Sequence, residues 1–316
     1  MISSNNILVV IAGPTAVGKT DISFSLAIQT NGEIIYADST ALYKELILGS
    51  ARPTDEMQKM IPHYMIGELS VRDEVSVALY QKIALSYLDN IFSRQKIAIM
   101  CGGSGLYIRS IIDDIVFPPG PSTEIRQKLR FEAKEKGLDY VYGKLMEIDP
   151  ESCNRISSQD IKRTIRALEV YYLTGIPFSV LTKNWNVTRS GFTLHYYVID
   201  RSDEEIKERI SRRTDEMVKD GLVEEVQELK KLGLDETLAC RQSIGYKEVI
   251  GYLDGDIDFG DMIELIKNNT MKLVKKQRKW FRSDKRAKWL LLDKDFVQED
   301  TVALIISEIN SGGGKI

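Results

Sequence analysis

One short segment limits the possible folds of this 316-residue chain more than any other feature; it reads Gly13-Pro14-Thr15-Ala16-Val17-Gly18-Lys19-Thr20. It matches the pattern G-x-x-x-x-G-K-[ST], in which backbone N–H groups converge on phosphate oxygens, the lysine adds a charge and the hydroxyl ligates Mg²⁺. It follows the apolar run 7–13 and precedes the helical pattern 21–28, which is the strand–loop–helix context that the pattern needs. We therefore expect a phosphate-binding loop here, with Thr20 as a metal ligand.

Short apolar runs that end in Gly or Asp alternate with helical patterns along the chain. They occupy residues 7–13, 33–38 and 96–102, and two later runs at 195–200 and 289–292 have the same character. This alternation predicts an α/β fold with a parallel sheet of about five strands. Because ligands collect beyond the carboxyl ends of such strands, the phosphate loop, Asp38 and residues 102–104 should border one crevice.

Between the third and fourth runs the sequence changes to charged, amphipathic helical patterns. A stretch rich in proline and glycine, 118–121, bounds this region upstream. We expect a helical insertion over residues 122–189, with 1–121 and 190–316 forming the α/β core. A helix is expected at 160–174.

The net charge of −3 hides an uneven distribution of basic residues. Residues 267–288 contain ten basic side chains and one acidic one, an excess that predicts contact with a polyanion. The pattern 160–174 also has a basic face, which is either an ordinary solvated face or an anion contact.

The three cysteines and two histidines are scattered, which excludes a disulfide framework and a Cys/His zinc site. No early apolar run is long enough to span a membrane, so we expect a cytoplasmic protein.

The second strand-like run ends in a carboxylate, Asp38, whereas the third ends in Cys101-Gly102-Gly103-Ser104 without one. Most loops of this kind bind ATP or GTP, but a nucleotide hydrolase also needs a strand-end aspartate for Mg²⁺. A standard ATPase is therefore disfavoured. Asp38 is placed to act as a base in the crevice; capping of a following helix is the alternative, and the two roles are compatible.

Taken in order, these motifs resemble the tRNA dimethylallyltransferase family, also called tRNA isopentenyltransferases. The resemblance rests on the phosphate loop and on segments 38–43, 47–53, 62–63, 102–108, 162–170, 221–226, 242–248 and 275–277, the last ahead of Trp280. Apart from the loop each segment is weakly specific, but their order and spacing are hard to obtain otherwise. The resemblance implies a P-loop kinase-like core with a helical insertion that binds the anticodon arm of tRNA.

The resemblance also implies a reaction. It is the transfer of a dimethylallyl group from dimethylallyl diphosphate to N6 of the adenosine 3′ of the anticodon, in tRNAs that read codons beginning with U. The loop would hold the diphosphate leaving group with Mg²⁺, which accounts for the missing second carboxylate. Asp38 would accept the N6 proton, and Lys19 and Arg209 would stabilise the leaving group. A surface pairing of Arg209 with Glu205 is the alternative.

Family correspondence assigns the tRNA contacts to both parts of the chain. They are Asp38, Ser39, Thr40, Ala41, Ser104, Arg126, Gln159, Asp160, Ile161, Lys162 and Arg163. The basic stretch 267–288 would add phosphate contacts, and Trp280 either stacks on a base or packs in the core. Leu79 and Met271 stand where the family carries an acidic residue and an arginine, which leaves the choice of tRNA open. We expect tRNA and dimethylallyl diphosphate as partners of a monomer.

Three other functions share parts of this pattern. A small-molecule or nucleoside kinase would share the loop and the sheet, but it gives no reason for a charged helical insertion. An adenylate isopentenyltransferase, which prenylates free AMP or ADP, would need neither the insertion nor the basic stretch. A non-catalytic RNA-binding protein would not need to keep Lys19, Thr20 and Asp38 intact.

Overall fold

The computed structural model describes residues 6–50, 52–73, 75–118, 120–183, 187–293 and 298–312, and the chain forms two compact units. The first unit comprises Met1–Val75, Leu79–Ile108 and Ser190–Ile316, and the second comprises Ser76–Ala78 and Arg109–Arg189. Among the described residues, no helix is both long and apolar enough to cross a bilayer.

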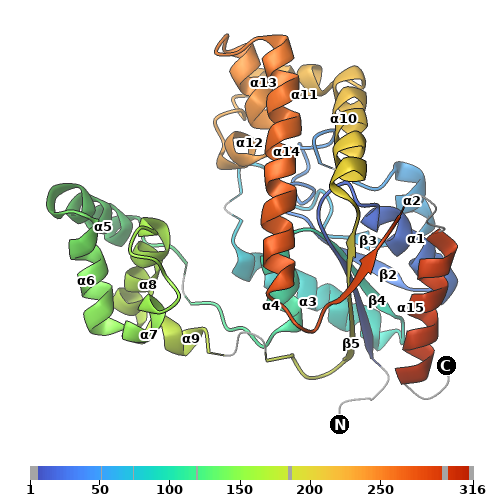
Figure 1. Cartoon of the computed structure of the whole chain (residues 1–316), viewed down its shortest axis with the longest axis horizontal. Coiled ribbons are helices and arrows are strands. Elements are labelled where there is room, and N and C mark those ends of the chain that lie inside the picture. Colours follow the sequence, from blue (N-terminus) through green and yellow to red (C-terminus); the bar gives the residue numbers. More distant parts are fainter. Residues whose placement is uncertain are drawn as a thin grey trace. The chain divides into compact units, whose positions relative to one another are not determined.

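The first unit is built on a parallel sheet with strand order β3-β2-β4-β1-β5-β6, coloured in Figure 1 along the chain. The strands are β1 (Ile7–Ala12), β2 (Glu33–Ala37), β3 (His63–Tyr64), β4 (Ala98–Gly102), β5 (Thr193–Asp200) and β6 (Lys288–Leu291). All residues of β2 and β4 are buried, as is usual for parallel strands covered on both faces. The five predicted runs are confirmed, and the parallel α/β fold with them. The prediction missed β3, because two residues show no periodic pattern.

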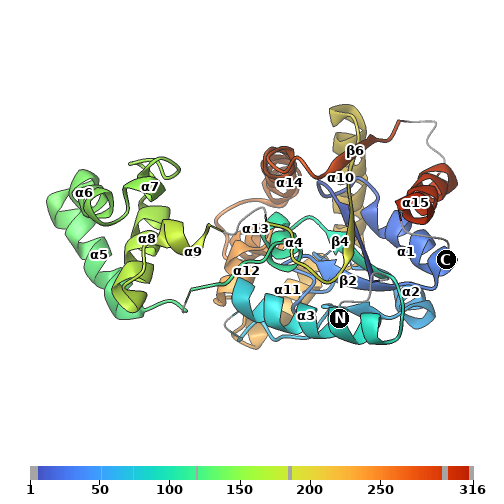
Figure 2. The ribbon, with the colours of Figure 1, turned by 90° about the horizontal axis from the view of Figure 1, so that it is seen from below.

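Helices surround this sheet and extend beyond it. They are α1 (Lys19–Thr30), α2 (Asp55–Met60), α3 (Val77–Ser93), α4 (Gly105–Ile112), α10 (Asp203–Lys219), α11 (Leu222–Lys231), α12 (Leu238–Gln242), α13 (Tyr246–Leu253), α14 (Phe259–Arg282) and α15 (Gln298–Gly312). Figures 1 and 2 show α10 and α14 side by side, and the two helices are in contact. A capping box of Ser202 and Glu205 begins α10, and Gly221, at φ 104°, separates it from α11.

The strand register brings three strand ends to one edge of the sheet. Gly102, the last residue of β4, pairs with Ala12 on β1 and with Ala37 on β2. A side chain on Gly102 would place its Cβ 2.1 Å from the carbonyl oxygen of Ala37, so only glycine fits between these strands. The segments that follow β1, β2 and β4 therefore start next to one another.

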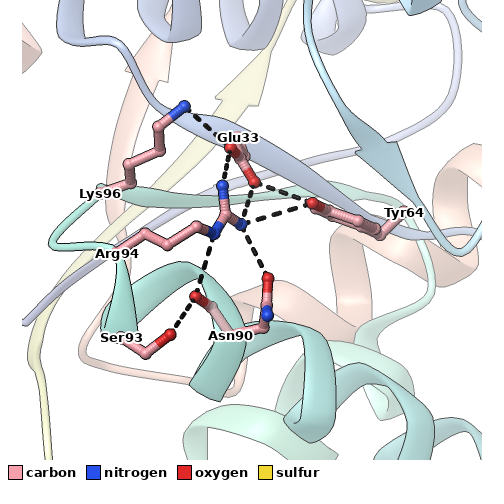
Figure 3. A network of polar contacts seen from close by, with 6 residues as sticks. All are labelled: Glu33, Tyr64, Asn90, Ser93, Arg94 and Lys96. Carbon is pink, nitrogen blue, oxygen red and sulfur yellow. Dashed lines mark hydrogen bonds and ion pairs between the residues drawn. The ribbon is translucent and has the colours of Figure 1, made fainter.

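A closed polar network joins strands at the opposite, amino end of β2 (Figure 3). The side chain of Glu33, only 1% exposed, accepts hydrogen bonds from Arg94 (2.6 Å), Lys96 (2.9 Å) and Tyr64 (2.9 Å). Burial alone would raise the pKa of Glu33, but these hydrogen bonds outweigh it and lower the pKa to about 2. The network ties β2 to β3 and to the segment that precedes β4.

The second unit consists of helices around its own apolar core. The helices are α5 (Thr123–Lys136), α6 (Leu138–Ile148), α7 (Pro150–Cys153), α8 (Ile161–Thr174) and α9 (Phe178–Leu181). Leu129, Val141, Leu145 and Leu168 are buried in this core. The helix expected at 160–174 is confirmed as α8, with Asp160 as its N-cap.

The second unit begins earlier than the expected insertion of 122–189. The chain enters and leaves it along two paired segments: Asp113 and Thr188 form an antiparallel bridge, and the amide of Arg189 donates to the carbonyl of Ile112. These hydrogen bonds attach residues 109–121 to the unit, whereas the prediction placed the boundary at the proline-rich stretch. The downstream boundary at 189 is the same in both.

Candidate functional site

The loop between β1 and α1 borders a cavity of about 250 Å³. All residues from Thr15 to Thr20 line it except Val17, which is buried. Positive φ angles at Ala16 (67°) and Gly18 (94°) turn the loop back toward the start of α1. This arrangement supports the predicted phosphate-binding loop, although Gly13 and Pro14 shape the loop without lining the cavity.

The first residue of the loop is pressed against β5. A Cβ on Gly13 would lie 2.2 Å from the carbonyl oxygen of Ile199, so this position accepts only glycine. The Nζ of Lys19 reaches back across the loop and donates to the carbonyl oxygen of Pro14 at 2.6 Å. Lys19 thus closes the loop and also presents its charge to the cavity.

Three arginines, Arg201 just past β5 and two from α10, hold successive residues of the loop. Arg213 Nη1 lies 3.1 Å from Thr15 Oγ1. Arg209 Nε donates to Ala16 at 2.6 Å, and Arg201 Nε donates to Val17 at 3.0 Å. Arg209 therefore lies at the phosphate loop, as the family resemblance implied. The alternative pairing with Glu205 is wrong, since Glu205 pairs with Arg201.

The cations around the cavity are partly removed from water. Burial lowers the pKa of Lys19 to about 8, with Arg213 acting in the same direction and Cys101 and Asp38 in the opposite one. Burial also lowers the pKa of Arg209 and of Arg213. Because desolvation disfavours the charged forms, a multivalent anion in this cavity would recover much of that energy.

Asp38 follows β2 directly and lines the same cavity as the loop and the arginines of α10. Its Oδ1 accepts hydrogen bonds from the amides of Thr40 (2.9 Å) and Ala41 (3.2 Å). Residues 39–50 contain no helix, so the alternative role of Asp38 as a helix cap is wrong, and Asp38 caps a turn instead. Neither of these hydrogen bonds uses Oδ2.

A second cavity, of about 410 Å³, adjoins the first. Thr15, Asp38 and Arg213 line both, so the carboxylate stands where the two cavities meet. The second cavity has hydroxyl, amide and aromatic walls and lies within the size range of small-molecule sites. Its lining includes Ser39, Thr40, Tyr43, Tyr107, Thr214, Gln242 and Ser243.

The remaining predicted tRNA contacts of the first unit lie beside Asp38. Ser39 and Thr40 line the second cavity, whereas Ala41 is 1% exposed and its side chain is covered. Ser104 Oγ accepts a hydrogen bond from the amide of Ser39 at 3.2 Å, and the Ser104 amide donates to Ala37 at 3.0 Å. Ser104 therefore bonds the residue before Asp38 and the residue after it.

Oxygen donors at the phosphate loop fit a magnesium ion that is bound mainly by phosphate and water. Thr20 and Asp38 line the same cavity, and Thr20 Oγ1 accepts a hydrogen bond from Tyr36 OH at 3.3 Å. Among the described residues no group of three or more His, Cys, Asp or Glu side chains could hold a metal. Mg²⁺ commonly uses few protein ligands and relies on substrate phosphates, so the predicted role of Thr20 stays a prediction consistent with this donor set.

The predicted tRNA contacts of the second unit fall into two groups. Gln159, Asp160, Ile161 and Lys162 line an open surface hollow. Next to it, Arg163 has a side chain that is 68% exposed. Asp160 caps α8, and Ile161 packs partly against the core of the unit. These residues form one polar surface on which the RNA contacts remain predicted.

Arg126 has a structural partner that the sequence did not reveal. Its guanidinium donates two hydrogen bonds to the buried carboxylate of Glu169, at 2.8 and 3.1 Å. The amide of Ser122 and the side chain of Arg166 bond the same carboxylate, each at 2.7 Å. Arg126 thus anchors the start of α5 to α8, and any contact with tRNA would add to that role.

The basic stretch 267–288 is only partly free to bind an anion. Internal ion pairs join Lys267 to Asp215, Arg278 to Asp200 and Asp203, Arg286 to Asp284, and Lys288 to Glu308. The expectation that the whole stretch contacts a polyanion therefore needs correction, because these four side chains have acidic partners within the protein. The exposed basic residues outside these ion pairs are Lys272, Lys275, Lys276, Lys279, Arg282 and Lys285.

Trp280 packs against the protein. A Cβ on Gly105, at the start of α4, would lie 2.1 Å from its indole ring, and the side chain is partly buried. Of the two roles expected for Trp280, stacking on a base and packing in the core, packing is the one observed.

Two residues of the site escaped the sequence analysis. Arg213 lies one helical turn after Arg209, a spacing that places both on one face of α10 and could have indicated a pair. Gln277 lines the phosphate cavity from α14, where it is a polar residue within a stripe that includes the buried Val274 and Phe281. A polar interruption of a buried stripe is the signal that could have identified it.

Comparisons with known proteins agree with this site. The model of the IPP transferase family matches residues 41–284. The chain is 41% identical over 289 residues to the tRNA dimethylallyltransferase of Halothermothrix orenii, covering 91% of this chain and 88% of that protein. It is 41% identical over 293 residues to the tRNA dimethylallyltransferase of Acetivibrio thermocellus, covering 92% and 93%.

Solved structures give the same result. A tRNA delta(2)-isopentenylpyrophosphate transferase from Staphylococcus epidermidis is similar with a TM-score of 0.71 and 31% identity, over 98% of this chain and 100% of that one. A eukaryotic dimethylallyltransferase acting on tRNA is similar with a TM-score of 0.80 and 26% identity, over 98% of this chain and 79% of that one.

Proposed function

Because the chain belongs to the IPP transferase family, we propose that it is a tRNA dimethylallyltransferase. It transfers the dimethylallyl group of dimethylallyl diphosphate to N6 of the adenosine 3′ of the anticodon, in tRNAs that read codons beginning with U. The products are N6-dimethylallyladenosine in tRNA and diphosphate. The activity of the named relatives supports the reaction, and the residues at the two cavities support the chemistry.

One observation carries the proposal most directly: Asp38 lines both the phosphate cavity and the larger cavity beside it. A prenyl transfer needs a diphosphate site, an acceptor site and a base at their junction. The phosphate loop with Lys19, Arg209 and Arg213 meets the first requirement, and the larger cavity meets the second. Asp38 meets the third.

The transfer forms one bond and breaks one bond at the allylic carbon. The N6 lone pair forms the new C–N bond, the allylic C–O bond breaks, and its electron pair leaves with the diphosphate. An exocyclic amine is a weak acid before attack, so its proton leaves with or after bond formation, and a plain carboxylate such as Asp38 can accept it. Lys19, Arg209 and Arg213 stabilise the charge that the diphosphate gains.

Mg²⁺ is the proposed cofactor, with Thr20 as its protein ligand. When bound, it would neutralise part of the diphosphate charge. The hydrogen bond from Tyr36 leaves Thr20 Oγ1 one further lone pair, and burial raises the pKa of Tyr36, so its hydroxyl stays a donor.

The surfaces proposed for tRNA have the required charge. The exposed lysines of α14 supply contacts to RNA phosphates, and Gln159, Lys162 and Arg163 supply polar contacts on the second unit. An unpaired loop base is extruded at less cost than a paired one, which suits an enclosed acceptor cavity. We propose that the enzyme works as a monomer in the cytoplasm, where its tRNA substrate is found.

The test is to incubate the protein with undermodified tRNA, Mg²⁺ and dimethylallyl diphosphate, and to measure N6-dimethylallyladenosine in digested RNA by mass. The proposal predicts product in tRNAs with A next to the anticodon on its 3′ side, and none with free AMP or ADP as acceptor. Prenylated AMP would instead favour an adenylate isopentenyltransferase. A parallel reaction with ATP and nucleosides that gives phosphate transfer without prenylation would favour a kinase.

A further inference from the structure

Gln277 joins two segments of the site that are far apart in sequence. Its Oε1 accepts a hydrogen bond from the amide of Thr15 in the phosphate loop at 2.9 Å. Its Nε2 donates to the carbonyl oxygen of Gly103, just past β4, at 3.0 Å. One carboxamide therefore bridges the phosphate loop and the β4 end, using one acceptor and one donor.

The β4 end continues this connection to Asp38. Ser104 follows Gly103, and it bonds the residues on both sides of the carboxylate, Ala37 through its amide and Ser39 through its hydroxyl. The chain of contacts thus runs from Thr15 through Gln277 and the 103–104 segment to the turn that carries Asp38. It links the loop for the leaving group to the turn for the base.

The fit around the carboxamide is tight. A Cβ on Gly103 would lie 2.3 Å from Gln277 Nε2, so an alanine there must displace the amide. Trp280, one turn further along α14, contacts Gly105 in the same close manner. Two side chains of α14 therefore fix the position of the 103–105 segment.

The helix that presents Gln277 is itself anchored. The adjacent Arg278 forms an ion pair with Asp200 at 2.9 Å and donates to the carbonyl oxygen of Arg201 at 2.7 Å. Arg201 in turn donates to Val17 in the phosphate loop. The position of α14 is thereby set relative to the same loop that Gln277 contacts.

We propose that Gln277 is a positioning residue that sets the separation between the phosphate loop and Asp38. Its carboxamide holds the Thr15 amide and the Gly103 carbonyl at fixed distances. The diphosphate bound by the loop and the Asp38 carboxylate then stay at the separation that the transfer needs. The inference rests on the proposed transfer reaction and adds to it a residue whose carboxamide bonds two backbone groups of the site. Small misplacements at such a site have large kinetic costs, on the order of 10²-fold per 1 Å.

The test is a double-mutant cycle of Gln277→Ala and Gly103→Ala, with Gln29→Ala, an exposed residue of α1, as the matched control. Two quantities are measured below the melting temperature of every variant: the affinity for inorganic diphosphate with Mg²⁺, and the single-turnover rate of prenyl transfer. Each single variant should weaken diphosphate binding about tenfold and slow transfer by 10- to 100-fold, roughly the cost of a sub-ångström to 1 Å misplacement. The KM for tRNA should not change.

The double variant decides whether the two residues act through one contact. Without the Gln277 carboxamide, the nearest remaining neighbour of the methyl added by Gly103→Ala is the carbonyl oxygen of Gly13 at 3.3 Å, so the severe clash is gone and the double variant should be no worse than the poorer single variant. Effects that multiply would overturn the proposal. So would variants that lose melting temperature but keep both wild-type diphosphate affinity and wild-type transfer.

The two readouts also separate this inference from the proposed function. If the wild-type protein transfers no prenyl group but binds diphosphate, the proposed function fails and the diphosphate affinities still decide the role of Gln277. If the wild-type protein binds no diphosphate, the inference fails with it. If Gln277→Met, which keeps the side chain's length but neither hydrogen bond, has wild-type affinity and rate, the carboxamide has no positioning role.

Discussion

The two ends of β2 each carry a carboxylate, and the two carboxylates have opposite surroundings. Glu33, the first residue of the strand, is buried and bonded by Arg94, Lys96 and Tyr64. Asp38, just past the last residue, is partly exposed and stands between two cavities, with both of its hydrogen bonds on one oxygen. A charge that is fully paired stabilises the fold, whereas one left open toward a cavity is available for chemistry.

The basic residues follow the same division. The cations near Glu33 are satisfied by its carboxylate, and they stabilise the strand pairing at that edge. At the phosphate loop, Arg201 pairs with Glu205, whereas the other three cations hydrogen-bond neutral groups of the loop: carbonyl oxygens for Lys19 and Arg209, and a hydroxyl for Arg213. Those neutral groups do not cancel the positive charge, so the loop end of the sheet is the one suited to binding an anion.

The largest expected effect is on the rate of prenyl transfer, when Asp38 at the carboxyl end of β2 is changed. Asp38→Asn keeps the size of the side chain and its acceptor for the Thr40 and Ala41 amides, but it cannot accept the N6 proton. The rate of transfer should fall by about 10³-fold, within the range for general bases. Single-turnover assays with radiolabelled donor measure it, and tRNA affinity should stay unchanged. A rate within tenfold of wild type would remove Asp38 as the base.

The matching change at Glu33, at the amino end of β2, should affect stability instead. Glu33→Gln removes the charge that Arg94 and Lys96 bond, and the free energy of unfolding should fall by about 1–3 kcal/mol, because both cations can still reach water. The rate of transfer below the melting temperature should not change. Urea unfolding monitored by fluorescence gives the free energy, and a loss of activity without a loss of stability would break the comparison.

The lowered pKa of Glu33 also predicts how the stability of the protein depends on pH. The pKa of Glu33 is lowered in the folded protein to about 2, so its contribution is complete above its unfolded pKa, about 4.3, and is lost as the pH falls toward 2. The stability difference between wild type and Glu33→Gln should therefore shrink between pH 4.3 and 2. A difference that stays constant over this window would mean that the charge of Glu33 contributes nothing.

A smaller effect concerns the charge at the phosphate loop. Because burial lowers the pKa of Lys19 to about 8, the free protein loses this charge as the pH rises above 8. The kcat/KM for dimethylallyl diphosphate should fall about fivefold between pH 8 and pH 9, because the protonated fraction of a single group with this pKa falls from about one half to about one tenth. A kcat/KM that stays flat to pH 10 would show that Lys19 remains charged or is dispensable.

The smallest effect is expected on the exposed face of α14. Lys279→Gln removes one charge that has no acidic partner among the described residues, so tRNA affinity should fall a fewfold, and the slope of log affinity against log salt should decrease by roughly one. Lys267→Gln is the matched control, because Lys267 is paired with Asp215. Equal effects of the two changes would show that α14 does not contact the RNA.

Local sequence patterns made the carboxyl end of the sheet, with the phosphate loop and Asp38, predictable. The phosphate loop has its own sequence signature, and Asp38 lies where a parallel strand must end. The hydrogen bond of Gln277 to Thr15 could not be predicted, because it joins residues 262 positions apart. Arg213, 198 positions from Thr15, was missed for the same reason. The Glu33 network also depends on partners that lie near one another only after the strands pair.

The boundary of the second unit shows a similar limit. The proline-rich stretch 118–121 predicted a boundary there, but the hydrogen bonds of Asp113 and Arg189 place it earlier in the chain. Such pairing of the two connecting segments has no local signature. The helices of the unit were predictable from amphipathic spacing, and Glu169, which joins α5 to α8, was not.

A crystal structure with inorganic diphosphate and Mg²⁺ tests the central claim most directly, since that claim places a leaving group and a base on facing walls. The account predicts diphosphate in the 250 Å³ cavity, within hydrogen-bonding distance of Lys19 and Arg213, with the Asp38 carboxylate still open to the larger cavity. Diphosphate bound elsewhere, or Asp38 turned away from that junction, would contradict it.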